Sequence, residues 1–256
     1  MENKIILANI IDSCNYNCRY CYNVFPRNGI ALNLDALYCF LNSLQISRCT
    51  PVMLNIEGGE PTLHKKLLNF CKQLQTLSNF KTYIYTNFSA STATYKDILS
   101  CMSINIVATW HLVDDAHTDD FLHKLQTLQC YKDRIEVVIM YEDINIDKSY
   151  DVMTKAKKLV SNINLSYICN TSTYKTTYTS EDNKHYLQLI SSSKKEYAFN
   201  NIRLSEPELT YYAKDFNFKH CLCEASMQSL YIHNNGLLYY CPSYYLEKKS
   251  SIGNIF

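Results

Sequence analysis

Along the first 170 residues, short apolar runs alternate with stretches in which apolar residues recur every three or four positions. Short apolar runs are typical of buried strands, and the wider spacing is typical of helices that pack one face on a core. Asn33 is the expected N-cap of the first helix. The expected strands are 4–11, 52–57, 81–87, 104–110, 134–141 and 163–169, and the expected helices are 33–45, 64–77, 91–102, 117–129 and 147–160.

The alternation of strands and helices predicts an α/β fold. Strands joined through helices by short connections pair in parallel and cross over with a right hand. A closed (βα) barrel needs eight units, whereas this pattern contains six strands, so we expect an open six-unit (βα) partial barrel. Ligands of parallel sheets bind at the carboxyl ends of the strands. The segments that follow the strands are therefore where chemistry is expected.

The pattern changes beyond the barrel, which predicts three parts. Residues 1–170 form the barrel core, and 171–203 form a polar connection rich in serine and threonine with one helical patch near 180–192. Residues 204–256 form a small extension. Two apolar arms around Asn234-Asn235-Gly236 in this extension predict a β-hairpin.

Charge and hydropathy exclude several classes of protein. Lys and Arg total 25 and Asp and Glu total 24, so no basic field points to a nucleic-acid partner. No run of about 18 apolar residues is present to span a membrane, and the apolar stretch at the N-terminus is too short for a signal peptide. We expect a cytoplasmic protein.

The chain contains twelve cysteines, which in a reducing compartment do not indicate a disulfide framework. Six stand alone and are expected to be buried core thiols. The other six form two groups, one near each end of the chain. The isolated cysteines are Cys39, Cys49, Cys71, Cys101, Cys130 and Cys169, and the groups are Cys14/Cys18/Cys21 and Cys221/Cys223/Cys241.

The first group follows the first strand with unequal spacing. Three close thiolates can bind zinc or an iron–sulfur cluster. A structural zinc site normally takes four ligands in two close pairs, but here the local set stops at three and no nearby histidine completes it. In a cubane of four irons, three cysteines leave one iron open to another ligand. The spacing therefore favours a cluster with a vacant iron.

These motifs resemble those of the radical S-adenosylmethionine (radical SAM) superfamily. The C-x3-C-x2-C spacing at 14–21, with aromatic Tyr20 before the last cysteine, is similar to the signature of that superfamily. The sequence GGEP at 58–61 ends the second strand and resembles a second motif. Thr-Asn at 86–87, after the third strand, resembles a further recurrent feature. A plain turn after a strand is the alternative explanation of GGEP.

The resemblance implies a [4Fe-4S] cluster and S-adenosylmethionine (SAM) as cofactors. Cys14, Cys18 and Cys21 would ligate three irons, and the amine and carboxylate of SAM would chelate the fourth. One electron, from a reductase or a flavodoxin-type donor, would cleave SAM. The 5′-deoxyadenosyl radical would then take a hydrogen atom from the substrate.

The same resemblance implies which residues hold SAM. Tyr20 would lie against the adenine, the two glycines of GGEP would let the backbone approach the methionine amino group, and Thr109 would contact the ribose. His111 ends the fourth strand and is expected either to touch SAM or substrate or to be satisfied by a neighbouring turn. The expected contacts are Tyr20, Gly58, Gly59, Glu60, Pro61, Asn87, Thr109 and His111.

The second cysteine group resembles the start of the SPASM/twitch extensions of radical SAM enzymes, which hold auxiliary iron–sulfur clusters. Cys221 and Cys223 precede the hairpin, and Cys241 ends it. Those extensions usually add cysteines further downstream, whereas this sequence stops at residue 256. An auxiliary [4Fe-4S] cluster with an open or unusual fourth ligand, a zinc site and plain thiols all remain open. The candidates for a fourth ligand are His220, His233 and Cys169.

The expected function is that of a radical SAM enzyme acting on a ribosomally made peptide, as SPASM/twitch relatives often do. No peptide-docking domain is visible before the first strand at Lys4, which weakens the peptide hypothesis. One alternative is a small-molecule substrate, as in a dehydrogenase or a 7-carboxy-7-deazaguanine synthase. A non-catalytic iron–sulfur or zinc module is a second alternative, but it leaves GGEP unexplained.

Overall fold

The computed structural model describes residues 4–21, 29–44, 50–141, 145–168, 228–242, 245 and 248–256. From residue 4 to residue 168, strands and helices alternate as the sequence predicts, so the expected α/β fold is confirmed. The parallel strands are β1 (Lys4–Ile11), β2 (Val52–Gly58), β3 (Phe80–Thr86), β4 (Ile104–Trp110), β5 (Ile135–Tyr141) and β6 (Asn162–Tyr167). The α-helices are α1 (Leu34–Ser43), α2 (Leu67–Leu74), α3 (Thr92–Leu99), α4 (Asp115–Thr127) and α5 (Ile146–Ala156), and the 3₁₀ turns are η1 (Pro61–Leu63) and η2 (Gln129–Arg134).

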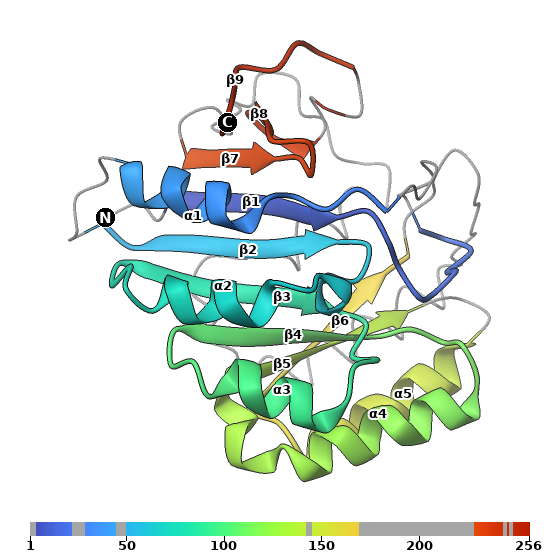
Figure 1. Cartoon of the computed structure of the whole chain (residues 1–256). Helices are drawn as coiled ribbons and strands as arrows, with labels where there is room; N and C mark the ends of the chain where they lie inside the picture. The colour runs from blue at the N-terminus through green and yellow to red at the C-terminus, as the bar shows by residue number, and fades with distance from the viewer. Residues whose placement is uncertain are drawn as a thin grey trace.

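The strands form one sheet in the order β6-β5-β4-β3-β2-β1-β7-β8-β9, and each neighbour from β1 to β6 pairs in parallel. The helices cover one face of this sheet, which curves as an open partial barrel (Figure 1). On β4, alternate residues enter the core: Ile104, Ile106 and Ala108 are 0% exposed. Because strand residues alternate between faces, the intervening residues point to the opposite face of the sheet.

Local chemistry explains where the helices begin. The side chain of Asn33 accepts hydrogen bonds from the backbone N–H groups of Asp35 (3.1 Å) and Ala36 (3.3 Å), which confirms it as the N-cap of α1. Ser91 and Asp114 cap α3 and α4 in the same way. Each cap satisfies backbone donors that the first turn of a helix leaves without partners.

The C-terminal hairpin extends the same sheet beyond β1. Its strands are β7 (Ser229–Ile232) and β8 (Leu237–Tyr239), joined by a turn in which Gly236 has φ +85°, and β9 (Gly253–Asn254) follows. β7 lies parallel to β1, with Ile5 opposite Ser229 and Ala8 opposite Ile232. The hairpin expected around 234–236 is therefore present, and its first strand shares the core of the barrel.

The isolated cysteines divide into two kinds. Cys71 and Cys101 are buried, as expected, but Cys39 and Cys130 are exposed, so the expectation of core thiols is wrong for these two. Cys39 lies on the solvent side of α1, because the buried stripe of this helix is made by leucines. Outside the described residues lie Cys49, Cys169 and the connection 171–203 with its expected helix.

Across the described part of the chain, no helix combines the length and the apolar character that crossing a bilayer requires.

The hairpin and the barrel should unfold as one cooperative unit, because Ile232 is 0% exposed and packs in the common core. We expect Ile232→Ala to lower the free energy of unfolding by about 2–5 kcal/mol in a single denaturant transition. The control is Ile252→Ala, since Ile252 is 44% exposed and its loss should cost less than about 0.5 kcal/mol. Two separate transitions in either variant would contradict a shared core.

Candidate functional site

Four connecting segments meet at the carboxyl ends of the parallel strands (Figure 1). They are the cysteine loop 12–21 after β1, the loop 59–61 after β2, the loop 87–90 after β3 and the loop 111–114 after β4. Hydrogen bonds and ring contacts, described below, join all four. The expectation that the motifs share one rim of the sheet is therefore met by direct contacts between them.

Two backbone hydrogen bonds fasten the glycine loop to the start of the cysteine loop. The N–H of Gly59 donates to the carbonyl oxygen of Ile11 (2.7 Å), and the N–H of Glu60 donates to the carbonyl oxygen of Ser13 (2.8 Å). A Cβ atom on Gly59 would lie 2.1 Å from that Ser13 oxygen, and one on Gly58, where φ is +146°, would lie 2.3 Å from the Ile11 oxygen. Both positions therefore require glycine so that the two backbones can touch.

The carboxylate of Glu60 joins the loops after β2 and β3. Glu60 is 0% exposed. Its Oε1 accepts from the N–H (3.0 Å) and hydroxyl (2.5 Å) of Thr62 and from the hydroxyl of Thr86 (2.7 Å), and its Oε2 accepts from the N–H of Asn87 (2.8 Å). Pro61, at the first position of η1, has no N–H to satisfy. Four donors around one carboxylate offset the cost of burying it.

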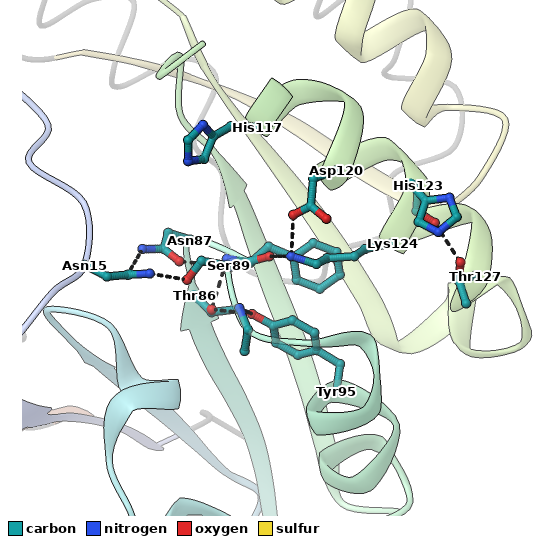
Figure 2. Close-up of polar contacts among 12 residues, drawn as sticks. Asn15, Thr86, Asn87, Ser89, Tyr95, His117, Asp120, His123, Lys124 and Thr127 are labelled. Carbon is teal, nitrogen blue, oxygen red and sulfur yellow. Dashed lines mark hydrogen bonds and ion pairs between the residues drawn. The ribbon is translucent and has the colours of Figure 1, made fainter. Parts of the chain in front are cut away.

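Asn87 connects the end of β3 to the cysteine loop (Figure 2). Its side-chain nitrogen donates to Oδ1 of Asn15 (2.9 Å) and lies 3.8 Å from Sγ of Cys14 in hydrogen-bonding geometry. Its Oδ1 accepts from the N–H of Ser89 (3.0 Å), and the hydroxyl of Ser89 accepts from Asn15 in turn (2.8 Å). This closed network fixes the orientation of Asn87 toward the sulfur.

The next residue, Phe88, holds a left-handed backbone with φ +60°, which is costly for a bulky side chain. Its ring packs on Tyr95 (centroids 4.4 Å apart) and Phe121 (5.4 Å). Its carbonyl oxygen accepts from Nζ of Lys124 (3.0 Å), and Lys124, which is buried, pairs with Asp120 (2.5 Å; Figure 2). Sequence reasoning missed this support, although Asp120 and Lys124 have the i,i+4 spacing of a helical ion pair.

The three cysteines of the loop are half-buried thiols. The N–H of Tyr16 donates to Sγ of Cys14 (3.4 Å), and a tight turn joins the N–H of Cys21 to the carbonyl oxygen of Cys18 (3.1 Å). Within the described ranges, no three His, Cys, Asp or Glu side chains converge closely enough to hold a single metal ion. A four-iron cluster differs, because each thiolate binds a separate iron atom.

His111 brings the end of β4 to the cysteine loop. Its Nδ1 lies 2.9 Å from the hydroxyl of Tyr20, the two rings stack with centroids 6.0 Å apart, and Tyr16 lies edge-on to it at 6.1 Å. Burial lowers the pKa of His111 to about 4, so the imidazole is neutral at pH 7. Burial also raises the pKa of the Tyr16 hydroxyl to about 12. Thr109 is half-buried on the same face of β4 as His111.

The C-terminal cysteine Cys241 lies at the other end of the sheet. The hydroxyl of Ser229, on the other arm of the hairpin, donates to the carbonyl oxygen of Tyr240, the residue before Cys241 (3.1 Å). Ser229 pairs with Ile5 at the start of β1. Cys14 follows the other end of β1, which places Cys241 roughly 20 Å from Cys14 along the strands. Cys221 and Cys223 lie outside the described residues.

The hairpin register also bears on the fourth ligand of any C-terminal site. The N–H of His233 donates to the carbonyl oxygen of Leu237, four residues before Cys241. Four residues of extended chain span about 13 Å. The hairpin therefore separates His233 from Cys241 and brings it instead to the rim, near Asp12.

This fold, with three thiols after its first strand, is the fold of radical SAM enzymes. The chain is similar over 99% of its length to SuiB of Streptococcus suis bound to S-adenosylmethionine, with TM-score 0.73, 14% identity and coverage of 63% of that chain. It thus spans less than two thirds of SuiB. It is also similar to anSMEcpe with bound AdoMet (TM-score 0.65, 14% identity, 99% of this chain and 78% of that chain).

A third similar structure is BtrN in complex with AdoMet and 2-DOIA, with TM-score 0.52, 14% identity and coverage of 100% of this chain and 80% of that chain. No protein-family model matches the sequence, and no curated protein matches it. At these identities the likeness establishes the fold, and the chemistry has to be argued from the residues of this chain.

Replacing Glu60 by Gln should destabilise the rim, because one carboxylate oxygen becomes an NH₂ group that faces donors from Thr62, Thr86 or Asn87. We expect a loss of about 2–3 kcal/mol in the free energy of unfolding, measured by chemical denaturation. Asp119→Asn makes the same chemical change at an exposed position of α4 and should stay within about 0.5 kcal/mol of the wild type. Equal losses in the two variants would show that the buried network does not matter.

Proposed function

We propose that this chain is a radical SAM enzyme. The observation that carries the proposal is the way the cysteine loop is built into the rim: Gly59 and Glu60 donate to the backbone just before Cys14, in a fold shared with structures that contain AdoMet. A plain strand turn does not need two glycines that press against the loop of a neighbouring strand, nor a buried carboxylate that binds a third loop.

The residues present fit a [4Fe-4S] cluster. Cys14, Cys18 and Cys21 supply three thiols, and the amide groups of Tyr16 and Asn87 point at the sulfur of Cys14. N–H donors favour the thiolate, which is the form that ligates iron. When cluster and SAM are bound, they supply an electron and a 5′-deoxyadenosyl radical that removes a hydrogen atom from the substrate.

The chain itself holds and orients these groups. Gly58, Gly59, Pro61, Asn87 and Thr109 are the proposed SAM contacts, together with Tyr20 and His111. An ammonium only donates hydrogen bonds, so the glycine loop would bind the methionine ammonium of SAM through its backbone carbonyl oxygens. His111 remains neutral at pH 7 and so does not repel the positive sulfonium. Glu60 is fully buried and acts by positioning the loops.

A ribosomally made peptide is the proposed substrate. SuiB has been solved bound to the precursor peptide SuiA, and this chain is similar to that structure with TM-score 0.73. It is similar to anSMEcpe bound to AdoMet and the Kp18Cys peptide with TM-score 0.66. BtrN, whose complex holds 2-DOIA, is less similar at 0.52, which favours the peptide over a small molecule. A reductase or a flavodoxin-type protein is the proposed electron donor.

The reconstituted protein should release 5′-deoxyadenosine. After anaerobic reconstitution with iron and sulfide, dithionite and SAM are added, and the nucleoside is measured by chromatography. Single Cys14→Ala, Cys18→Ala or Cys21→Ala substitutions should reduce its release to the background without enzyme, because each removes a thiolate that holds an iron.

The matched control is Cys39→Ala, which removes an exposed thiol on α1 and should release the nucleoside at the wild-type rate. If the wild type binds iron and sulfide but cleaves no SAM, the chain is a binding module and the proposed function is wrong.

We also propose an auxiliary iron–sulfur cluster at Cys221, Cys223 and Cys241. Reconstituted wild type should then contain more than about four irons per chain, since one cubane accounts for four. The triple substitution of these cysteines by Ala should remove the excess, whereas the double variant Cys39→Ala/Cys130→Ala should not. An iron content that stays at about four in wild type and triple variant would eliminate this cluster.

A further inference from the structure

The face of the sheet that points away from the helices carries a polar patch on β1 and β2. Ala8, Leu54 and Ile56 face the helices and belong to the core. Asn9 and Glu57 therefore point to the opposite face, and they are directly opposite each other in the β1–β2 register. We call this group, with Asn55 two residues before Glu57 on the same face, the acceptor patch.

Two amide oxygens of the acceptor patch have no hydrogen-bond donor among the residues that the structure describes. Asn9 is 9% exposed and Asn55 is 6% exposed, and the Oδ1 atom of each is buried without a hydrogen-bond partner. Among the described residues, no hydrogen bond or ion pair reaches the carboxylate of Glu57. Within the described part of the chain, two buried amide oxygens and one half-buried carboxylate on adjacent strands therefore have no donor, which is costly for the buried oxygens unless a ligand supplies donors.

No cation from the described ranges acts on the pKa of Glu57. Ile56 pairs with Ile84, so the next residues, Glu57 and Tyr85, lie on neighbouring strands. Burial raises the pKa of the Tyr85 hydroxyl, and the carboxylates of Glu136 and Glu57 raise it further. Burial raises the pKa of Glu136, and a hydrogen bond with Asn164 and the charge of Lys81 partly offset this rise. Neither Asn164 nor Lys81 acts on Glu57.

Tyr231, on β7, is a further titratable neighbour of Glu57, and its hydroxyl also interacts with the side chain of Asn9. Burial raises the pKa of this hydroxyl, so Tyr231 is neutral at pH 7. Burial raises the pKa of Glu57 itself to about 7. Desolvation without a partner is the cause, and a cation placed beside this carboxylate would bring the pKa back down.

We propose that Asn9, Asn55 and Glu57 bind a cationic N–H-donating group of the substrate, an alkylammonium or alkylguanidinium such as a lysine or arginine side chain. An ammonium has three donors and a guanidinium has five, and neither has an acceptor, so both complement the two amide oxygens and the carboxylate of the patch. The assignment of this cation to a substrate rests on the proposed function, because the patch lies on the inner face of the barrel beneath the rim where SAM is expected.

SAM carries an ammonium group as well, so the same chemistry has a second source. Glu57 immediately precedes the glycine loop, but it still belongs to β2. Its side chain lies on the inner face of the sheet, opposite Asn9 on β1 and beside Tyr85 on β3. The rim residues, by contrast, follow the strand ends. This placement favours the substrate as the source, and competition between the two cations decides it.

The test uses the full-length, anaerobically reconstituted protein and n-butylammonium as the probe, with uncharged n-butanol as its isostere. Isothermal titration calorimetry should show that the ammonium binds and the alcohol does not. Glu57→Gln should weaken binding of the ammonium roughly tenfold, and Asn55→Ala should weaken it to a smaller extent. Asp119→Asn, an exposed exchange on α4, should leave it unchanged. Unaltered thermal unfolding of the variants shows that they fold.

Binding should also depend on pH in a direction that the Glu57 carboxyl sets. Below pH 6 the carboxyl is protonated and the affinity should be low. It should rise as the pH passes through about 7, the pKa of Glu57, and level off above it. This rise should disappear in Glu57→Gln. Equal binding of the alcohol, or unchanged affinity in Glu57→Gln, would overturn the proposal.

Repeating the titration in the presence of saturating SAM distinguishes a substrate cation from the ammonium of SAM. The affinity for n-butylammonium should be the same with and without SAM, whereas competition would show that the patch belongs to SAM and would overturn the assignment to a substrate. Binding is measured without dithionite and is independent of SAM cleavage. A chain that binds the probe yet releases no 5′-deoxyadenosine would thus contradict the proposed function and not the cation site.

Discussion

The rim of the sheet depends on the buried carboxylate of Glu60. The loops after β1, β2 and β3 are far apart in the sequence, so noncovalent contacts have to bring them together. Glu60 binds the loop after β3 through its side chain and the cysteine loop through its backbone N–H. A buried charge is tolerated only when it is fully hydrogen-bonded. The donors therefore stabilise the Glu60 carboxylate, and the carboxylate in turn requires the loops to place those donors around it.

The two faces of the sheet differ in character, because residues along a strand alternate between them: one face packs on the helices and the other is polar. On β2, Leu54 and Ile56 are 0% exposed and supply stability through burial against the helices. Asn55 and Glu57, one position away, contribute no apolar burial, and the buried Oδ1 of Asn55 has no hydrogen-bond partner in the described part of the chain. A protein tolerates such a cost where a ligand is to be bound. The polar inner face is thus a better guide to function than the apolar face that packs on the helices.

Periodicity and turn chemistry predicted the fold because they are local. The bounds of β1 and the cap at Asn33 follow from residues within a few positions of each other. What the sequence did not predict is long-range: the parallel pairing of β7 with β1 joins residues more than 200 positions apart, and the bond from Lys124 to the Phe88 carbonyl joins a helix to a strand end. Likewise, GGEP marked its glycines, but the partners that require them, Ile11 and Ser13, appear only in three dimensions.

The pairing of β7 with β1 has a consequence for the cysteine loop. In a six-stranded open sheet β1 would be an edge strand, with one row of backbone groups bound to water and more freedom to fray. Here β1 pairs with β2 on one side and β7 on the other. The hairpin turn also reaches the rim, where the side chain of Asn234 donates to the carbonyl oxygen of Ile30 (3.3 Å). Asp12, whose N–H bonds the same carbonyl, leads directly into the cysteines. The C-terminal hairpin therefore stiffens the strand that carries the proposed cluster, whether or not its own cysteines bind metal.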